Sequence, residues 1–398
     1  MISELSNVIQ PYAWGSRHAL AQLRGEPAPS PTPEAELWMG AHPLAPSRLC
    51  TTGQSLNEAV ASAPSELLGR EVAATYGAQL PFLLKVLAAA TPLSLQAHPS
   101  IEQAEAGFAA DEAAGLALDA PHRNYRDRNH KPELLCALSE FWALCGFREV
   151  SATLALLDEL SLPELAQVSR ALVEDGSSMG LSRVFSALMM APAGEREALA
   201  QATTAACAAK AGSSARFAEE LRWGARIGAL YPGDVGVVVA LLLNLLRLAP
   251  GEAIYLPAGN LHAYLEGTGV EIMASSDNVL RGGLTPKHVN VQELLRVLDF
   301  STLNVQPLRA VEVGREHIYR TPAREFQLSY FQVTDAPVAV TVGGPEIWLV
   351  ATGHVALEGA GARLELRPGK SAFVSASVTD LRLSGSGRIF RARVAQPG

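Results

Sequence analysis

An imidazole, an ammonium group and a carboxylate lie within four residues of this chain, immediately before an apolar run. His130, Lys131 and Glu133 end the stretch YRDRNHKPE, which begins at Tyr125, and the apolar residues 134–138 follow. Charged groups that enter an apolar strand are costly to bury unless a metal ion or an opposite charge receives them. The stretch indicates an active-site strand, although a polar loop before an ordinary core strand would show the same residue types.

Two other segments contain possible metal ligands at short spacing. Gln96 and His98 are two residues apart in the run LSLQAHP, so on a strand both side chains would lie on one face. The segment PGEAIYLPAGNLH has the spacing G-x5-P-x-G-x2-H of the second cupin motif and ends at His262, with Glu266 where that motif usually has Asn. With Glu133, these residues would form a nitrogen and oxygen metal site without cysteine.

One rival carboxylate lies close to the Gln-x-His pair. The first cupin motif has a Glu four residues after its second His, and Glu102 stands at that distance from His98. However, Pro99 follows the histidine, and residues 100–103 read as the start of a helix. A helix would turn Glu102 away from the strand face, so we predict Glu133 as the carboxylate ligand.

The proposed ligand set has a chemical meaning. Two neutral His, one carboxylate and one carboxamide oxygen leave a position open for water or a substrate oxygen, as in a catalytic zinc site. Two His and one carboxylate also suit an iron oxygenase. The ligands alone therefore leave both metals open.

The overall composition limits the class of protein. The chain has 398 residues, a 48% hydrophobic fraction, a formal net charge of −8 and a pI of about 5.7, so we expect two or three domains and no nucleic-acid partner. A small anionic substrate remains compatible with this charge, because local basic residues matter more than the net charge.

The cysteines and the apolar segments indicate where the protein works. Four cysteines are scattered without CxxC spacing, and three have apolar neighbours, which favours reduced thiols and a cytoplasmic location. The N-terminus lacks the pattern of a signal peptide. The longest apolar run, 235–243, is too short for the roughly 20 residues that cross a bilayer. We therefore expect no membrane partner.

The residue pattern changes along the chain. Residues 1 to about 145 contain short strand-like pieces, whereas 150–232 are rich in Ala and Leu with helical spacing, which predicts an inserted helical domain. The run 235–246 could be a buried helix or a strand, and 291–298 is predicted to be helical. The helical spacing in the insert is clearest at Leu181, Val184, Phe185 and Leu188.

The last hundred residues alternate short β pieces with Gly-rich turns, as in a β-sandwich or barrel. They also contain a weak internal repeat: PGKSAFV, which begins at Pro368, resembles PGEAIYL, which begins at Pro250. The second copy lacks the Pro and His that follow in the first, because Ser375 and Asp380 stand there. We therefore predict two related β units, of which only the first keeps a metal site.

Several long blocks resemble the type I mannose-6-phosphate isomerase family. They are YRDRNHKPE, LSLQAHP, QPYAWG at residues 10–15 and ASSDNVLRGGLTPK at 274–287, and they run in order over about residues 10 to 300. The departures are small, such as Gly282 where the family often has Ala. The resemblance implies zinc-dependent interconversion of mannose 6-phosphate and fructose 6-phosphate, with one Zn²⁺ per chain held by Gln96, His98, Glu133 and His262.

The resemblance also implies a fold and a division into domains. We expect a mainly β chain with an inserted α-helical domain and two cupin, or jelly-roll, β-barrels, the first of which carries the metal. The catalytic barrel would comprise residues 1–147 and 235–305, the helical insert 148–234, and the C-terminal jelly roll without a metal 306–398.

Isomerisation requires a proton to move between C1 and C2 through an enediol, with a base near the carbon and positive charge near the oxygen. Strand parity places Lys131 on the face of Glu133 and His130 on the other face. Lys131 and Glu271 are the candidate acid and base groups, with a metal-bound water as a third option. Arg281 is expected to stabilise the enediolate or position the substrate.

Other residues are expected to bind the sugar phosphate. Ser94 and Lys287 correspond to family positions near the phosphate, since a phosphate needs cations and hydroxyl donors. Tyr264 shares a face with His262 and could bind a sugar hydroxyl. The remaining candidates for the pocket are Asp277, Trp14 and Lys85.

Two alternatives to a zinc isomerase remain at this stage. An iron cupin oxygenase would use the same barrel for dioxygen chemistry, and a non-catalytic bicupin would bind a sugar phosphate without turnover. The concentration of ionisable residues beside the ligands favours the enzyme. We expect a small phosphosugar as the only ligand besides the metal, and a monomer or a weak homo-oligomer.

Overall fold

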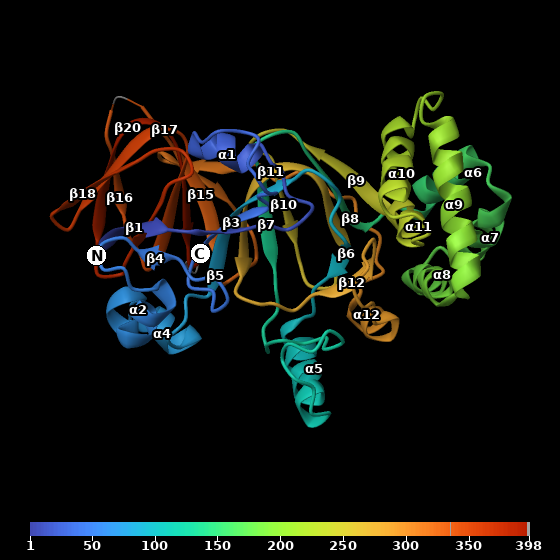
Figure 1. The fold of residues 1–398 in the computed structure, drawn as a ribbon, viewed down its shortest axis with the longest axis horizontal. Coiled ribbons are helices and arrows are strands. Elements are labelled where there is room, and N and C mark those ends of the chain that lie inside the picture. The colour runs from blue at the N-terminus through green and yellow to red at the C-terminus, as the bar shows by residue number, and fades with distance from the viewer. Residues whose placement is uncertain (335, 396–398) are drawn as a thin grey trace.

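The computed structural model describes residues 1–334 and 336–395, which fold around two ten-stranded sheets. One sheet lies in the middle of the molecule, the other forms one end, and most of the helices gather at the opposite end (Figure 1). All named strand pairs are antiparallel. The predicted sheet-rich fold is confirmed.

The central sheet follows the path β10-β7-β11-β5-β3-β2, and four further strands extend it. The longest strand of this sheet, β11, pairs with β5, β6, β7 and β8 and so joins the two parts of the sheet. The strands are β2 (Val8–Gln10), β3 (Glu36–Met39), β5 (Phe82–Ala89), β6 (Leu95–Ala97), β7 (Glu133–Ala137), β8 (Phe141–Phe147), β9 (Leu243–Leu248), β10 (Ala253–Leu256), β11 (His262–Ala274) and β12 (Leu280–Gly283).

The second sheet, here called the C-terminal sheet, follows the path β13-β14-β15-β20-β17-β19-β1-β4. Its members come from the last third of the chain, except for two strands near the N-terminus. They are β1 (Ile2–Ser6), β4 (Arg48–Leu49), β13 (Val311–Val313), β14 (Glu316–Tyr319), β15 (Gln327–Val333), β16 (Val338–Thr341), β17 (Glu346–Gly359), β18 (Ala362–Leu366), β19 (Ser371–Val374) and β20 (Asp380–Arg393).

The predicted helical character of residues 150–232 is confirmed. The helices there are α6 (Val150–Leu160), η1 (Pro163–Leu165), α7 (Ala166–Glu174), α8 (Ser178–Met190), α9 (Ala193–Lys210) and α10 (Ala218–Leu230). The apolar positions that predicted α8 are all buried. The ambiguous run 235–246 contains both structures, since α11 (Gly236–Leu241) is followed directly by β9.

The other helices lie outside the two sheets. They are α1 (Ala19–Arg24), α2 (Leu56–Ser62), α3 (Pro64–Leu67), α4 (Arg70–Tyr76), α5 (Ile101–Ala113) and α12 (Val291–Val297), the last as predicted. Helix α5 extends away from the body of the molecule (Figure 1). Within the described residues, none of the helices is both long and apolar enough to cross a bilayer.

Strand β5 shows how the chain separates its core from its functional side. All eight residues of β5 are buried. Leu84 and Val86 pack in a core that also includes Phe390 of the C-terminal sheet, whereas Leu87 belongs to a separate cluster on the other face. Because alternate residues of a strand face opposite sides, Lys85 shares the face of Leu87.

The two sheets repeat one pattern of strand pairing. The path β10-β7-β11-β5-β3-β2 of the central sheet matches β19-β17-β20-β15-β14-β13 of the C-terminal sheet, strand for strand. The register agrees as well: Glu133 lies opposite Leu256 and Met273, and Glu346 lies opposite Val374 and Arg393. The weak internal repeat in the sequence therefore corresponds to a repeated ladder.

Candidate active site

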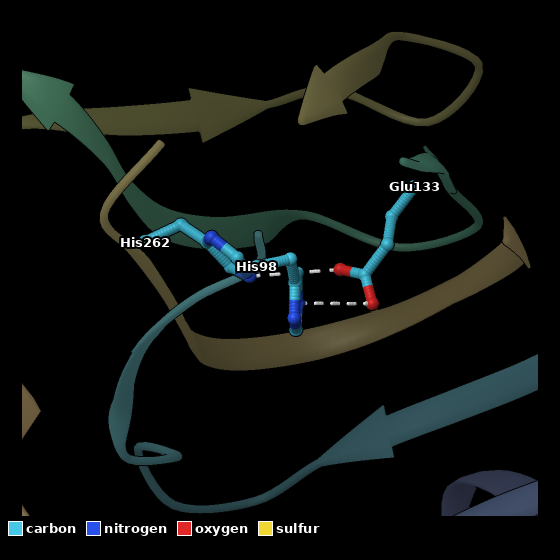
Figure 2. A group of neighbouring side chains, drawn as sticks. All are labelled: His98, Glu133 and His262. Atoms are coloured by element: carbon cyan, nitrogen blue, oxygen red, sulfur yellow. Dashed lines mark ion pairs between the residues drawn. The ribbon is translucent and has the colours of Figure 1, made fainter. Parts of the chain in front are cut away.

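The predicted metal ligands lie at the ends of three strands. Gln96 is in β6 and His98 follows it, Glu133 begins β7, and His262 begins β11 directly opposite Gln96. Figure 2 shows His98, Glu133 and His262 pointing toward one another from separate strands. Segments far apart in the sequence thus converge on one point.

The spacing of these side chains suits a single cation. One ligand atom from each of His98, Glu133 and His262 lies within 4.8 Å of the other two. The Nε2 atom of His98 is 3.4 Å from Oε1 of Glu133, and Nε2 of His262 is 3.5 Å from Oε2 (Figure 2). All three side chains are buried.

The hydrogen bonds of the two histidines fix their tautomers. Nδ1 of His98 is 2.7 Å from the carbonyl of Asn278, and Nδ1 of His262 is 2.9 Å from the carbonyl of Asn260. A carbonyl only accepts, so each Nδ1 carries the proton and each Nε2 carries a lone pair. Among the described residues, both Nε2 atoms and Oε2 of Glu133 are buried without a hydrogen-bond partner.

The electrostatics keep this cluster in the form that binds metals. Burial lowers the pKa of His98 to about 4, although the charge of Glu133 opposes the shift. Burial alone would raise the pKa of Glu133, but the charge of Lys131 lowers it, and the net shift is downward. At neutral pH the site therefore offers neutral imidazole and carboxylate, and three orphaned acceptor atoms meet the requirement of a metal site.

Glu102 belongs neither to this cluster nor to its buried surroundings, because its side chain is exposed. It lies in the first turn of α5, which begins with a capping box between Ser100 and Gln103. Its carboxylate accepts a hydrogen bond of 2.8 Å from the hydroxyl of Ser100. The helix start that the sequence indicates is therefore present, with Ser100 as its N-cap and Glu102 in its first turn.

A second group of charged residues lies beside the metal cluster. Nζ of Lys85 is 3.5 Å from Glu271 and 3.6 Å from Glu36. The hydroxyl of Tyr264 donates a hydrogen bond of 2.8 Å to Glu271. Burial alone would lower the pKa of Lys85, but Glu36 and Glu271 raise it, so the ammonium stays charged.

Glu271 has the protonation behaviour of a general base. Burial and the charge of Glu133 raise its pKa to about 7, while Lys85 opposes the shift. A carboxylate whose pKa lies near neutrality can both accept and release a proton at physiological pH. Tyr264, which we expected to bind a sugar hydroxyl, uses its hydroxyl on Glu271.

The two basic residues of the YRDRNHKPE stretch point to different partners. Nζ of Lys131 is 3.3 Å from Oε1 of Glu133, so these side chains share a face as strand parity predicts. His130 lies on the other side, where its Nε2 is 2.8 Å from Glu325 of the C-terminal region. Lys131 is buried beside the cluster, and His130 is partly exposed.

A cavity of about 610 Å³ opens onto these groups. Most of the predicted site residues line its wall, whereas His98 and His262 are buried behind the wall. The predicted residues on the wall are Trp14, Lys85, Ser94, Gln96, Lys131, Glu133, Tyr264, Glu271, Asp277, Arg281 and Lys287.

Many other residues on the wall are absent from our sequence prediction, among them Glu36, Trp38, His42, Arg126 and Tyr231. Nε2 of His42 is 3.3 Å from Asp277, and Trp38 donates a hydrogen bond of 2.7 Å to Glu36. A buried lysine requires carboxylates, so Lys85 signalled that partners such as Glu36 exist. The pairing of β3 with β5 brings Glu36 to Lys85, and the residues next to Lys85 in the sequence do not indicate this pairing.

A family model and several characterised proteins match this chain. The model of the phosphomannose isomerase type I catalytic domain matches residues 2–150. Mannose-6-phosphate isomerase of Escherichia coli is 38% identical over 397 residues, which cover 98% of this chain and 99% of that protein. The human mannose-6-phosphate isomerase is 34% identical over 368 residues, with 85% and 82% covered.

Solved structures show the same similarity. A variant of phosphomannose isomerase from Salmonella typhimurium superposes with a TM-score of 0.92 at 37% identity, covering 99% of this chain and 100% of that chain. A mannose 6-phosphate isomerase structure described as zinc-bound gives a TM-score of 0.91, also at 37% identity and with the same coverage.

Proposed function

Because this chain belongs to the type I phosphomannose isomerase family and is a mannose-6-phosphate isomerase, we propose that it works with one zinc ion through an enediol. In this proposal mannose 6-phosphate and fructose 6-phosphate interconvert as a proton moves between C1 and C2. One observation supports it most strongly: Glu271, whose pKa is raised to about 7, lines the same cavity as Glu133, which forms a cluster of possible metal ligands with His98 and His262.

We propose that Gln96, His98, Glu133 and His262 hold the zinc ion. Nε2 of His98, Nε2 of His262 and Oε2 of Glu133 are buried without hydrogen-bond partners among the described residues, which supports these three side chains as ligands. Gln96 adds a carboxamide on the cavity wall. When bound there, zinc would supply a Lewis acid that polarises a substrate oxygen. Zinc in a homologous structure supports the identity of the metal.

The proton transfer is assigned to the chain's own residues. Glu271 accepts the proton from the substrate carbon and returns it to the neighbouring carbon, because its pKa lets it do both. Lys85 and the hydroxyl of Tyr264 hold its carboxylate in place through contacts of 3.5 Å and 2.8 Å. Lys131, 3.3 Å from Glu133, is the cation that can exchange a proton with the substrate oxygens.

The remaining wall residues bind and orient the sugar phosphate. Arg281 stabilises the enediolate or positions the substrate, and Ser94 and Lys287 bind the phosphate. Trp14 and Asp277 complete the wall around the sugar. The cavity of about 610 Å³ is large enough for a hexose phosphate.

We propose that both sheets are cupin, or jelly-roll, units. The matched pairing paths and registers of the two sheets support this description. The division proposed from the sequence assigns 1–147 and 235–305 to the catalytic barrel, 148–234 to the helical insert and 306–398 to the second unit. Strand β1 lies within the first of these ranges and pairs with β19 of the C-terminal sheet.

A coupled assay of the purified protein tests the proposed function. We expect turnover of mannose 6-phosphate to fructose 6-phosphate that disappears on chelation and returns with zinc. No turnover in the zinc-loaded protein would contradict the isomerase, and turnover that requires iron and dioxygen would indicate an oxygenase. Sugar-phosphate binding without turnover would indicate a binding protein.

Two variants separate the metal from the substrate residues. Glu133→Ala should lose zinc, and full zinc occupancy in that variant would contradict the proposed ligand set. Arg281→Ala should keep zinc and the thermal unfolding midpoint while its turnover falls. Unchanged turnover would remove Arg281 from the mechanism.

A further inference from the structure

The loop that carries Lys131 also brings an arginine to the mouth of the cavity. The backbone N–H of Arg126 donates a hydrogen bond of 2.7 Å to Oδ1 of Asn278. Nδ2 of the same Asn278 donates to the carbonyls of Asp127 and Asn129, each at 2.9 Å. The position of Arg126 is therefore fixed relative to the segment that leads into β12 and Arg281.

Three cations face one another at this mouth. Arg126, Arg281 and Lys287 all line the cavity. Burial lowers the pKa of Arg281 and the charge of Arg126 adds to the shift, while burial, Arg281 and Arg126 lower the pKa of Lys287. Within the described residues, none of the three side chains forms an ion pair with a carboxylate.

Like charges held together without counter-ions destabilise a protein unless a ligand supplies the opposite charge. Asp277 also lines the cavity. Burial would raise its pKa, but His42, Lys131 and Arg126 lower it, so this carboxylate stays charged close to the three cations. Three positive charges and one negative charge leave two positive charges. A phosphate monoester carries about −1.5 to −2 at neutral pH, so it would balance this excess.

We propose that Arg126 is a specificity-determining residue that binds the phosphate of the substrate together with Arg281 and Lys287. This inference rests on the proposed function and deepens it, because it names the residue that makes the enzyme prefer a phosphorylated sugar. Arginine suits this task, since its guanidinium can donate two parallel hydrogen bonds to phosphate oxygens.

Arg128 provides a matched control in the same loop. It lies two residues after Arg126, is also exposed, and its guanidinium lies 5.2 Å from the centre of the Phe108 ring. It is absent from the cavity wall. Replacing either arginine removes one positive charge from the loop, but only one replacement removes a charge from the cavity.

The test compares Arg126→Gln and Arg128→Gln in the zinc-loaded enzyme, with mannose 6-phosphate and with unphosphorylated mannose as substrates. For Arg126→Gln we expect KM for mannose 6-phosphate to rise about ten- to a hundredfold, which corresponds to the loss of one hydrogen bond between charged groups. We expect kcat for mannose 6-phosphate to change little, and the rate measured with mannose to equal that of the wild-type enzyme. Inhibition by inorganic phosphate should weaken by a similar factor.

Arg126→Lys should recover part of the affinity, because it restores the charge without the two-pronged geometry. Equal KM values in Arg126→Gln and wild type would overturn the inference. An equal loss with both substrates would overturn it as well, since it would show a general effect on the site. Absence of mannose 6-phosphate turnover in the wild-type enzyme would instead contradict the proposed function, and circular dichroism with thermal unfolding checks that each variant is folded.

Discussion

The central and C-terminal sheets share one order of paired strands, but they bury different charged residues at matching positions. In the central sheet, Leu135 of β7 lies opposite Glu271 of β11, which lies opposite Lys85 of β5. The matching row of the C-terminal sheet consists of Trp348 in β17, Arg391 in β20 and Ser329 in β15. An arginine therefore occupies the place of the carboxylate that we propose as the catalytic base.

The carboxylates that begin β7 and β17 show the effect of this exchange. Glu133 faces two imidazole nitrogens that lack hydrogen-bond partners among the described residues, whereas Glu346 is fully paired. Nη2 of Arg391 donates hydrogen bonds to Oε1 of Glu346 and to the carbonyl oxygen of Thr341. Nε1 of Trp348 donates a hydrogen bond of 2.9 Å to Oε2 of Glu346.

The comparison shows why the central sheet forms a candidate active site, whereas the same positions of the C-terminal sheet form part of its buried core. Where the row holds Arg391, its guanidinium neutralises the buried carboxylate of Glu346 from within the chain. Where it holds Glu271, the acidic groups outnumber their internal partners, and a metal ion can complete the balance. A buried charge without a full set of partners costs stability, so such places mark function.

The largest effect should come from removing the carboxylate in the row of the central sheet. Glu271→Gln should lower kcat by roughly 10²- to 10⁴-fold, because it removes the proposed general base while keeping the size of the side chain. The control is Ser329→Ala in the matching row, which should leave kcat unchanged. Steady-state kinetics measures both, and similar kcat values in the two variants would break the comparison.

Removing the arginine in the C-terminal row should act on stability instead. Arg391→Met should lower the free energy of unfolding by about 3–5 kcal/mol, because it leaves Glu346 buried without its counter-charge. The double variant Arg391→Met, Glu346→Gln should recover part of this loss. Chemical denaturation gives the free energies of unfolding. In both variants, kcat per folded molecule should equal that of wild type. An Arg391→Met protein as stable as wild type would contradict the role of this pair.

Zinc should distinguish the two sheets directly. Binding at one hundred times the dissociation constant stabilises a folded protein by about 2.7 kcal/mol, so chelation should lower the thermal unfolding midpoint. Hydrogen exchange should show that zinc slows the amides of β7 and the start of β11. The amides of β17 and β20 should exchange at the same rate with and without zinc, and equal protection of both sheets would show that the metal acts on the whole molecule.

The pH dependence of catalysis should follow the carboxylate of the central row. Glu271 must be deprotonated to accept a proton, and burial raises its pKa to about 7. The value of kcat/KM should therefore fall by about tenfold for each pH unit below that point and level off above it. The pH profile of Glu271→Gln should lack this acidic limb, whereas Ser329→Ala should retain it; a limb that persists in Glu271→Gln belongs to another group.

The sequence predicted those parts of the site that depend on local spacing. Gln96 and His98 share a strand face, and Lys131 shares the face of Glu133, because alternation along a strand is a property of neighbouring residues. The motif that ends at His262 placed this residue at the start of a strand. Pro99 and the residues after it predicted a helix start that includes Glu102, and the structure has a capping box at the start of α5.

The parts that the sequence left open depend on contacts between distant segments. Lys85 was a candidate without a partner, because the carboxylates of Glu36 and Glu271 reach it only through the pairing of β5 with β3 and β11. Arg126 had no local signal, since its partner Asn278 is far along the chain. The run 235–246 is apolar except for Gly236 and Asn244 and has no clear periodicity, so its change from helix to strand at Leu242 depends on the tertiary surroundings.

The internal repeat shows the same limit within the fold. The similarity between the segments that begin at Pro250 and Pro368 predicted two related β units. Asp380, which begins β20, lies opposite Thr341, as His262 lies opposite Gln96. The role of Arg391 could not be read from its sequence neighbours, because the pairing of β17 with β20 brings it to Glu346.

Strand β1 has a consequence for how the chain is made. Residues 2–6 pair on one edge with β4, which is synthesised soon after them, and on the other edge with β19, residues 371–374 (Figure 1). During translation this second edge stays open until residues 371–374 have left the ribosome. An open strand edge invites pairing with other chains, and late closure of a long loop slows folding. The pairing of β1 is therefore completed only after most of the C-terminal sheet has been synthesised.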